Sequence, residues 1–183
     1  MKWPPKVSVI IPTLSKVPKT IESIPRGVEV LIIREGNRSE ARNKGAHMAS
    51  GEILVFCDDD IVFTEDFFWE VIKRKKDREI IGLEDYDFGL LLTRFMVVSK
   101  KEFMDINGFD ESLNHMEDTD FCLRAKKKGY KLVKLPRDSV IHIEHECRVR
   151  RWERWLHYFK LLKKHKLEFL ILLLKLVKRK VRV

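Results

Sequence analysis

Short apolar runs rich in β-branched residues recur along the first third of the chain, and they constrain the fold more than any other feature. The first, "VSVIIP", stops at Pro12, and the next two are "GVEVLII" and "EILVF". Short runs that are apolar at nearly every position are typical of strands buried on both faces of a parallel sheet. We therefore predict strands over residues 7–11, 28–33 and 52–56.

Helical patterns separate these runs. "TLSKVPKTIESIP" leaves room for a short helix between Pro18 and Pro25, and "SEARNKGAHMASG" predicts a helix that Ser39 caps and Gly51 ends. Further helices are expected in "EDFFWEVIKRKK", "KKEFMDING" and "MEDTDFCLRAKKKGY", and later strands in "FGLLLTRFMVV", "KLVKLP" and "SVIHIEH". This alternation predicts one α/β domain with a mainly parallel sheet flanked by helices, whose ligands bind beyond the carboxyl ends of the strands.

The positive charge of the chain is concentrated at its end. The 183 residues carry a net charge of +9, but residues 146–183 hold 13 Lys and Arg against 3 Asp and Glu, while residues 1–145 hold 24 against 25. A neutral body with a basic appendage suits a membrane surface or an acidic partner better than nucleic acid. We therefore divide the chain into a body, 1–145, and a basic helical tail, 146–183, and expect no nucleic-acid partner.

The tail has the pattern of amphipathic helices. Trp152, Trp155, Phe159 and Leu162 recur at helical spacing among Arg and Lys residues. The later apolar stretch, 167–177, is shorter than the roughly 20 residues that span a bilayer. Three arrangements stay open, namely a helix packed on the body, an element for homodimer formation, and an anchor at a membrane surface. Aromatic residues beside Arg and Lys favour the anchor.

The cysteines and the N-terminus bear on the location of the protein. The three cysteines are odd in number and lack CxxC spacing, so neither a disulfide framework nor a zinc site is expected. The N-terminal stretch holds too few consecutive apolar residues for the apolar region of a signal peptide. Together with the tail, these features predict a cytoplasmic protein that is peripheral on the inner face of the cell membrane.

Three consecutive carboxylates follow the third predicted strand in "VFCDDDIVF", at Asp58, Asp59 and Asp60. Adjacent carboxylates repel one another, and burying them without partners costs several kcal/mol each. A divalent cation at the strand end removes this cost, because Mg²⁺ and Mn²⁺ bind one or two carboxylates and complete their shells with water and phosphate oxygens. The alternative is a solvated acidic turn before a helix that Thr64 caps.

A second acidic cluster, Glu117, Asp118 and Asp120, opens a predicted helix. Acids in a first helical turn are ordinary stabilisers of the helix dipole. A carboxylate at a helix start can also take a proton from a substrate hydroxyl. The cluster alone does not decide between these interpretations.

The motifs occur in an order that resembles the inverting, family 2 glycosyltransferases of the GT-A fold. "VSVIIPT" is similar to the first strand and nucleotide-contacting turn of the family, and "ARNKGAHMASGEILVFCDDD" to its ARNxG…AxGExxxFxDxD run. "NGFDE" resembles GGFDE, and "MEDTDFCLRAKKKGYKL" resembles EDxDxxxRxxxxGY. The resemblance covers roughly residues 7–145. It implies a single GT-A-like, Rossmann-related domain.

The resemblance also implies a role for each matching residue. It implies that the nucleotide sugar is bound by Pro12, Thr13, Glu35, Arg42, Asp58 and Asp59, with Arg42 reaching the nucleotide as a cation. It implies a metal held by Asp60 and Asp58, with His142 or His145 as a further contact. It also implies that Glu117 and Asp118 form the catalytic pair, with Asp118 as the general base, and that Gly108 and Asp110 shape the acceptor side.

Three positions depart from the family pattern. Glu35, in "IIREGNRS", stands where the family usually has an Asp, and we expect it to substitute. The segment that usually lies between this turn and "ARN" is missing, which leaves the nucleotide pocket more open or completed by another chain. Asn107 replaces the first glycine of GGFDE, which bears on a backbone contact to the acceptor.

These observations predict a glycosyltransferase that depends on Mn²⁺ or Mg²⁺ and moves a hexose, with inversion, from a nucleotide-diphosphate sugar. The expected acceptor is a hydroxyl of a glycan or of a lipid-linked acceptor, which fits polysaccharide biosynthesis. One alternative is a magnesium-dependent nucleotidyltransferase-type enzyme, although "IPTLSKVPK" lacks the glycines of a phosphate loop. The other is a non-catalytic basic binding module, although the body is close to neutral.

Overall fold

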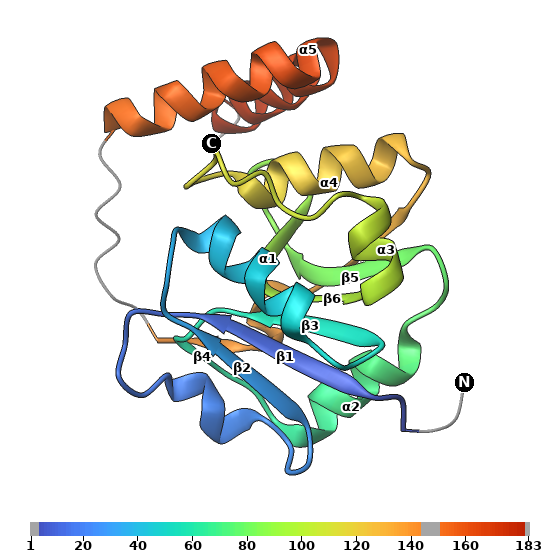
Figure 1. Cartoon of the computed structure of the whole chain (residues 1–183). Helices are drawn as coiled ribbons and strands as arrows, with labels where there is room; N and C mark the ends of the chain where they lie inside the picture. Colours follow the sequence, from blue (N-terminus) through green and yellow to red (C-terminus); the bar gives the residue numbers. More distant parts are fainter. Residues whose placement is uncertain (1–3, 144–150, 182–183) are drawn as a thin grey trace.

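A computed structural model describes residues 4–143 and 151–181 of the chain and, in the second range, the side chains of residues 155–177. Figure 1 shows a central sheet with helices on both faces and a helical tail stacked beyond α4. The strands are β1 (Val7–Pro12), β2 (Glu29–Ile33), β3 (Ile53–Cys57), β4 (Ile61–Val62), β5 (Glu79–Glu84), β6 (Leu91–Ser99), β7 (Lys131–Leu135) and β8 (Ile141–His142). The helices are η1 (Lys19–Ser23), α1 (Arg38–Met48), α2 (Glu65–Arg74), α3 (Lys100–Asp105), α4 (Glu117–Lys127), η2 (Arg137–Ser139) and α5 (Arg151–Val181).

The main sheet has six strands in the order β2-β1-β3-β6-β5-β7. β1 pairs in parallel with β2 and with β3, and β5 pairs in parallel with β7. Only β6 runs antiparallel to its neighbours, β3 and β5. A second, two-stranded sheet joins β4 to β8. The predicted α/β fold with a mainly parallel sheet is therefore confirmed.

The sequence prediction omitted β5 altogether. This strand has Glu79 and Glu84 at its ends, and its register with β6 shifts between Gly82 and Leu83. Charged ends and an irregular glycine hide the apolar run on which the prediction relied. "FGLLLTRFMVV" forms a single strand, β6, in a segment where strand structure was predicted, so only β5 comes from an unexpected segment.

Two apolar cores lie on the two faces of the sheet, as the alternation of side chains along β3 shows. Leu54 and Phe56 join a core with residues of α3, α4 and α5, whereas Val55 and Cys57 join a core with residues of α2. All five residues of β3 are buried, which fits a central strand covered on both faces. The triplet therefore follows a strand that is buried along its whole length.

Helix α1 starts and ends differently from the prediction. Its N-cap is Asn37, whose side chain accepts hydrogen bonds from the backbone N of Ser39 at 2.9 Å and of Glu40 at 3.1 Å. The expected cap, Ser39, is wrong, because it lies inside the helix and its hydroxyl donates to the carbonyl of Leu113 at 2.8 Å. The helix ends at Met48, before the predicted stop at Gly51. The "N-x-x-E" capping box therefore overrides the serine.

Gly45 allows α1 to approach β1 closely. A Cβ atom at this position would lie 2.5 Å from Cγ2 of Ile10, which is closer than side-chain atoms tolerate. The helix consequently sits directly on the strand, and Arg42, one turn earlier, is buried at the rim of the sheet. This is the local reason for the glycine in "ARNKG".

The tail helix α5 consists of two helices joined at Lys166, whose backbone is non-helical with φ 44° and ψ −117°. Leu161, Phe169 and Leu172 are buried and share the core with residues of α4. The packed arrangement of the tail is thus observed for one side of these helices. In the described parts of the chain, no helix is long and apolar enough to cross a membrane.

Candidate active site

The carboxyl ends of β1 and β3 lie side by side, because these strands pair in parallel. Thr13, directly after β1, is therefore next to the acidic triplet that follows β3. The antiparallel strand β6 brings Arg94 to the same rim, where its carbonyl accepts a hydrogen bond from the backbone N of Asp58 at 3.0 Å. The α4 helix begins above this rim and supplies the second acidic cluster.

Asp58 is held by two arginines. Its Oδ1 accepts a hydrogen bond from Nη2 of Arg42 at 2.8 Å, and its Oδ2 lies 4.0 Å from Nε of Arg94. The hydroxyl of Thr20 donates to its carbonyl at 2.7 Å. The side chain of Asp58 is 29% exposed, so one edge of it stays open to a ligand.

Asp59 fixes the loop after β1. Its Oδ2 accepts a hydrogen bond from the hydroxyl of Thr13, whose oxygen in turn accepts from the backbone N of Ser15 at 2.8 Å. Its carbonyl accepts from the backbone N of Lys19 at 3.0 Å. The middle carboxylate of the triplet therefore positions the predicted nucleotide-contacting turn.

Asp60 faces the small second sheet. Its Oδ2 lies 3.0 Å from Nε2 of His142 on β8, and its carbonyl accepts from the backbone N of Ile143 at 2.8 Å. The other histidine expected near a metal, His145, lies outside the described residues. The structure thus brings Asp60 and His142 together, as the sequence predicted for one of the two histidines.

A carboxylate oxygen beside an imidazole nitrogen is a donor set that suits Mn²⁺ and tolerates Mg²⁺. Within residues 4–143 and 151–181, however, no group of three His, Cys, Asp or Glu side chains could hold a metal ion. Such sites normally complete their coordination with phosphate oxygens and water. Asp60 and His142 therefore fit a divalent ion that arrives with a diphosphate.

Arg42 connects the two acidic clusters. Its side chain is 1% exposed; Nη2 contacts Asp58, and Nη1 contacts Oε1 of Glu117 at 2.6 Å. Burial lowers the pKa of Arg42, but Asp58 and Glu117 outweigh burial and raise it. Both Nη atoms are engaged by carboxylates, and the expected contact of this cation with the nucleotide stays a prediction. Arg42 bridges the carboxylates of Asp58 and Glu117.

Asp118 differs from its neighbours in the acidic cluster. It is the second residue of α4, and among the described residues it accepts a hydrogen bond only from the backbone N of Thr119, at 2.7 Å. Burial and the adjacent carboxylate of Glu117 raise the pKa of Asp118 to about 7, Asp85 acts in the same direction, and Arg42 opposes them. A carboxylate with this pKa can accept a proton near neutral pH.

Asp120 serves the fold. It is fully buried, and it accepts hydrogen bonds from Nε of Arg124 at 2.8 Å and from Nε2 of His165 at 2.7 Å, with Nζ of Lys164 at 2.8 Å. Burial alone raises its pKa, but these partners hold the pKa of Asp120 well below its usual range. His165 and Lys164 belong to the tail, so Asp120 fastens α5 to α4.

A pocket of about 500 Å³ opens beside Asp59 at the ends of β1 and β2. It is lined by Pro12, Thr13, Leu14, Ile33, Arg34, Gly36, Asn37, Arg38, Ala41, Asp59, Asn114, His115 and His157. We call it the rim pocket. Glu35, the expected substitute for the family's Asp, is not among these residues, because its carboxylate pairs with Lys44 on α1. The tail contributes His157, whose ring centroid is 6.0 Å from that of His115.

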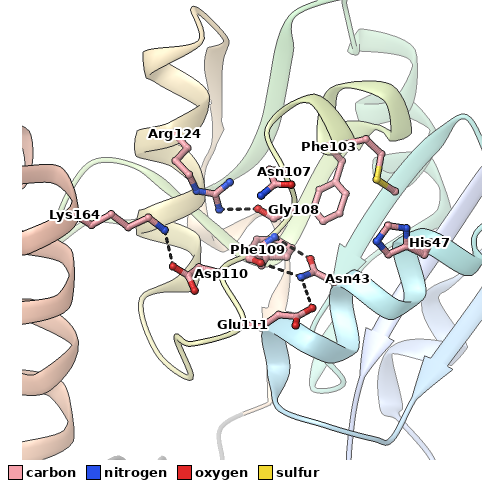
Figure 2. A pocket seen from close by; sticks show the side chains of 11 residues that line it. Asn43, His47, Phe103, Asn107, Gly108, Phe109, Asp110, Glu111, Arg124 and Lys164 are labelled. Carbon is pink, nitrogen blue, oxygen red and sulfur yellow. Dashed lines mark hydrogen bonds and ion pairs between the residues drawn. The ribbon is translucent and has the colours of Figure 1, made fainter.

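Gly108 and Asp110 line a different pocket, of about 610 Å³, which shares no residue with the rim pocket. Figure 2 shows it between α1, α3 and the tail. Gly108 has φ 55°, and a Cβ atom there would lie 2.7 Å from Oδ1 of Asn43, which also accepts from the backbone N of Phe109 at 2.9 Å. Asp110 accepts from Lys164 of the tail at 2.6 Å. The structure therefore gives both residues roles in shaping the "NGFDE" loop.

Three residues at the site were not predicted from the sequence, namely Arg94, Asp85 and His157. Arg94 is a charged residue inside the otherwise apolar run "LLTRFMVV", and that exception was a usable signal. Asp85 follows the strand that the prediction omitted. His157 lies among the basic residues of an amphipathic helix, and nothing in the sequence sets it apart.

Cys57 and Cys122 are free and buried, and burial raises the pKa of both thiols. Neither thiol contributes to the site. Cys147 lies outside the described residues. The prediction of a chain without a disulfide framework is not contradicted by the two described cysteines.

The family "Glycosyl transferase family 2" matches residues 14–123, which is more than half of the chain. The uncharacterized glycosyltransferase YwdF of Bacillus subtilis (strain 168) is 24% identical over 198 residues, covering 75% of this chain and 74% of that protein.

Two solved structures show the same fold. The mannosyltransferase PcManGT from Pyrobaculum calidifontis, in complex with GDP-Man and Mn²⁺, gives a TM-score of 0.65 at 15% identity over 87% of this chain. The chain spans 64% of the length of that protein. The catalytic domain of Drosophila beta1,4galactosyltransferase 7, in complex with xylobiose, gives a TM-score of 0.60 at 15% identity, covering 83% of this chain and 79% of that one.

A mutant of the Drosophila enzyme in complex with manganese, UDP-Gal and xylobiose has the same TM-score, 0.60, at 13% identity. At these identities the structures establish the fold, and the match over residues 14–123 establishes the family. Together with the motif order and the site geometry, these matches identify the chain as a glycosyltransferase that belongs to glycosyl transferase family 2 and has the GT-A fold.

Proposed function

We propose that this glycosyltransferase moves a hexose, with inversion, from a nucleotide-diphosphate sugar to a hydroxyl of a glycan or a lipid-linked acceptor. The observation that carries the proposal is the division between the two acidic clusters. Asp58 and Asp60 face cations or an imidazole, whereas Asp118 has a pKa raised to about 7 and no cationic hydrogen-bond partner among the described residues. One cluster is suited to a charged diphosphate and the other to a proton.

The reaction that fits this geometry is a single displacement. The acceptor oxygen forms a bond to the anomeric carbon while the bond from that carbon to the phosphate oxygen breaks, and its electrons leave with the nucleoside diphosphate. Asp118 takes the proton of the attacking hydroxyl. Because attack and departure occur on opposite faces of the sugar, the configuration at the anomeric carbon inverts.

The leaving diphosphate gains negative charge, which the site must stabilise. Arg94, with its side chain 22% exposed, is the arginine beside Asp58 that can reach a ligand, since Arg42 is buried. Asp60 and His142 would hold a divalent ion, with Asp58 near it. When bound, Mn²⁺ or Mg²⁺ supplies positive charge to the diphosphate oxygens. The Mn²⁺ in PcManGT and in the Drosophila mutant supports this assignment.

The rim pocket is the proposed nucleotide site. It is lined by Pro12 and Thr13, the residues of the expected nucleotide-contacting turn, and it adjoins the triplet through Asp59. Its volume of about 500 Å³ is within the range of small-molecule sites. The GDP-Man and UDP-Gal complexes of the structural neighbours support a hexose donor.

A panel of UDP-, GDP- and dTDP-hexoses tests the proposal, with donor hydrolysis measured in the presence of Mn²⁺ and of EDTA. At least one donor should release its nucleoside diphosphate with Mn²⁺, and EDTA should reduce the rate to background. Asp60→Asn should weaken Mn²⁺ binding in calorimetry, whereas Asp66→Asn, an exposed acid on α2, should not. Release of hexose 1-phosphate, with the nucleoside monophosphate transferred, would instead indicate nucleotidyl transfer. Equal rates with Mn²⁺ and with EDTA would contradict the dependence on a metal.

A further inference from the structure

The outer side of the tail carries the largest group of exposed apolar side chains in the described chain. Its members are Trp155, Leu156, Phe159, Leu167, Leu170, Ile171, Leu174 and Val177, each between 42% and 66% exposed. We call this set the outer face. Within each helix of the tail these positions lie one, three or four residues from nearby members of the set, a spacing that keeps them on one broad side of that helix. Exposed patches of this kind mark interaction surfaces.

The side of the tail opposite the outer face packs on the body, so the outer face stays exposed to solvent. Leu161, His165 and Phe169 are at most 3% exposed and pack on the body. Lys164 and His165 are tied to Asp120, and Lys127 of α4 pairs with Glu168 at 2.8 Å. The buried contact between His165 and Asp120, together with the more exposed pairs of Lys164 and Glu168, fixes the orientation of the tail, and the outer face points to solvent.

Positive charge accompanies the outer face. Lys163, Lys166 and Lys175 are exposed, and within the described parts of the chain none of them forms an ion pair. Residues 146–183 together carry 13 Lys and Arg against 3 Asp and Glu. A second copy of this chain would bring the same positive charge against it, which disfavours a symmetric dimer through this face. An anionic lipid surface is complementary to both the apolar and the charged side chains.

A groove of about 550 Å³ joins the outer face to the rim pocket. Leu156, Phe159, Lys160 and Lys163 line it from the tail, and Asn114 and His157 line both this groove and the rim pocket. Apolar walls with lysines at the edge match the boundary between acyl chains and phosphate headgroups. The groove places such a boundary directly beside the proposed donor site.

We propose that the outer face docks on an anionic membrane surface, lying in the interface without crossing it, and that lysines around the groove contact lipid phosphates. Insertion of the apolar positions and attraction of the lysines both contribute to the binding. The membrane then lies next to the rim pocket, at the end of the molecule formed by α4 and α5 (Figure 1).

The test is co-sedimentation of the full chain with vesicles of phosphatidylcholine, with and without phosphatidylglycerol. The full chain should bind the anionic vesicles and lose binding at high salt. The double variant Phe159→Ser with Leu170→Ser should reduce the affinity about tenfold, because two interfacial anchors are removed. Lys163→Gln should reduce it about fivefold at low ionic strength.

Matched controls separate this surface from apolar residues and lysines in general. Met48→Ser, at an exposed position on α1, and Lys73→Gln, on α2, should bind like the parent chain. Unchanged donor hydrolysis in the double variant shows that the fold is intact. Equal binding by the double variant and the parent, equal binding to both kinds of vesicle, or a stable dimer that binds no vesicles would overturn the proposal.

Discussion

In both acidic clusters of the site, carboxylates lie close together and repel one another. The two clusters differ in the partners that offset this repulsion. After β3, each carboxylate has a side-chain partner from another element, and these partners are Arg42, Thr13 and His142. At the start of α4, the partners are distributed unequally. Asp120 has three cationic or imidazole partners, whereas Asp118, two residues earlier, accepts only a backbone hydrogen bond within the described chain.

This difference supports the proposed division between carboxylates that bind charged groups and a carboxylate that accepts a proton. The cationic and imidazole partners of Asp120 hold its pKa well below its usual range, so Asp120 is not suited to accept a proton near neutral pH. Asp118 is partly desolvated beside Glu117, so its pKa rises to about 7. The contrast between Asp118 and Asp120 therefore supports the proposed general base at Asp118 and a structural role for Asp120, although both belong to the same helical turn.

The largest expected effect is on the base. Asp118→Asn removes the proton acceptor but keeps the shape, so kcat/KM for transfer should fall by roughly 10²- to 10⁴-fold. Donor affinity, measured by calorimetry with a nucleotide sugar, should change less than about threefold, since the proposed donor site is the rim pocket. Asp87→Asn, an exposed acid in the turn after β5, is the matched control and should leave transfer unchanged.

The pH dependence checks the same residue. The active form of Asp118 is ionised, so kcat/KM should rise tenfold per pH unit below about pH 7 and level off above it. This direction follows because the pKa of Asp118 is raised; Glu117, Asp85 and Arg42 are the charged groups that set it. A profile that stays flat from pH 5 to 8, or wild-type transfer by Asp118→Asn, would show that another group is the base.

The next effect concerns Arg42, which bridges the two acidic clusters. Arg42→Ala leaves Asp58 and the buried Glu117 without their shared cation, and breaking a buried ion pair from one side costs about 3–5 kcal/mol of unfolding free energy. Urea denaturation measures this loss of unfolding free energy. Arg74→Ala removes a surface pair with Glu70 and should cost less than about 1 kcal/mol. Equal losses in the two variants would mean that the clusters do not depend on Arg42.

A smaller effect is expected at the structural acid. Asp120→Asn weakens the contacts to Lys164 and His165 and should lower the unfolding free energy by about 2 kcal/mol. Transfer measured below the unfolding transition should stay within about threefold of the parent, in contrast to Asp118→Asn. Glu168→Gln, which removes a more exposed tie between tail and α4, is the control and should cost less than about 1 kcal/mol. Loss of transfer without loss of stability would contradict the structural role.

The strands could be predicted from the sequence where the local apolar pattern matches the fold. The strands at β1, β2 and β3 and the place of the triplet at their carboxyl ends followed from short β-branched runs, and they are observed. β5 was not predicted because its glycine and charged ends break the apolar pattern. Asn37 and Ser39 are both good caps, and only the position of Glu40 three residues after Asn37 distinguishes them.

The motifs in the sequence identified several residues of the site, but they did not predict the contacts between those residues. The motif match brought Asp58, Asp60 and Asp118 to notice, but the burial of Arg42 depends on the close approach of α1 to β1. Which of the histidines faces Asp60 depends on pairing between β4 and β8, two short strands far apart in the sequence. Contacts made across such distances cannot be seen in the spacing of a motif.

His157 lies on the tail and lines the rim pocket, so the helix proposed to lie on lipid also forms part of the proposed donor site. Two ligands that engage one element are thermodynamically linked whenever either binding shifts that element. Linkage is reciprocal: the factor by which an anionic surface changes donor affinity equals the factor by which bound donor changes lipid affinity. In such an enzyme, donor binding and membrane binding would be coupled through the helix that carries His157.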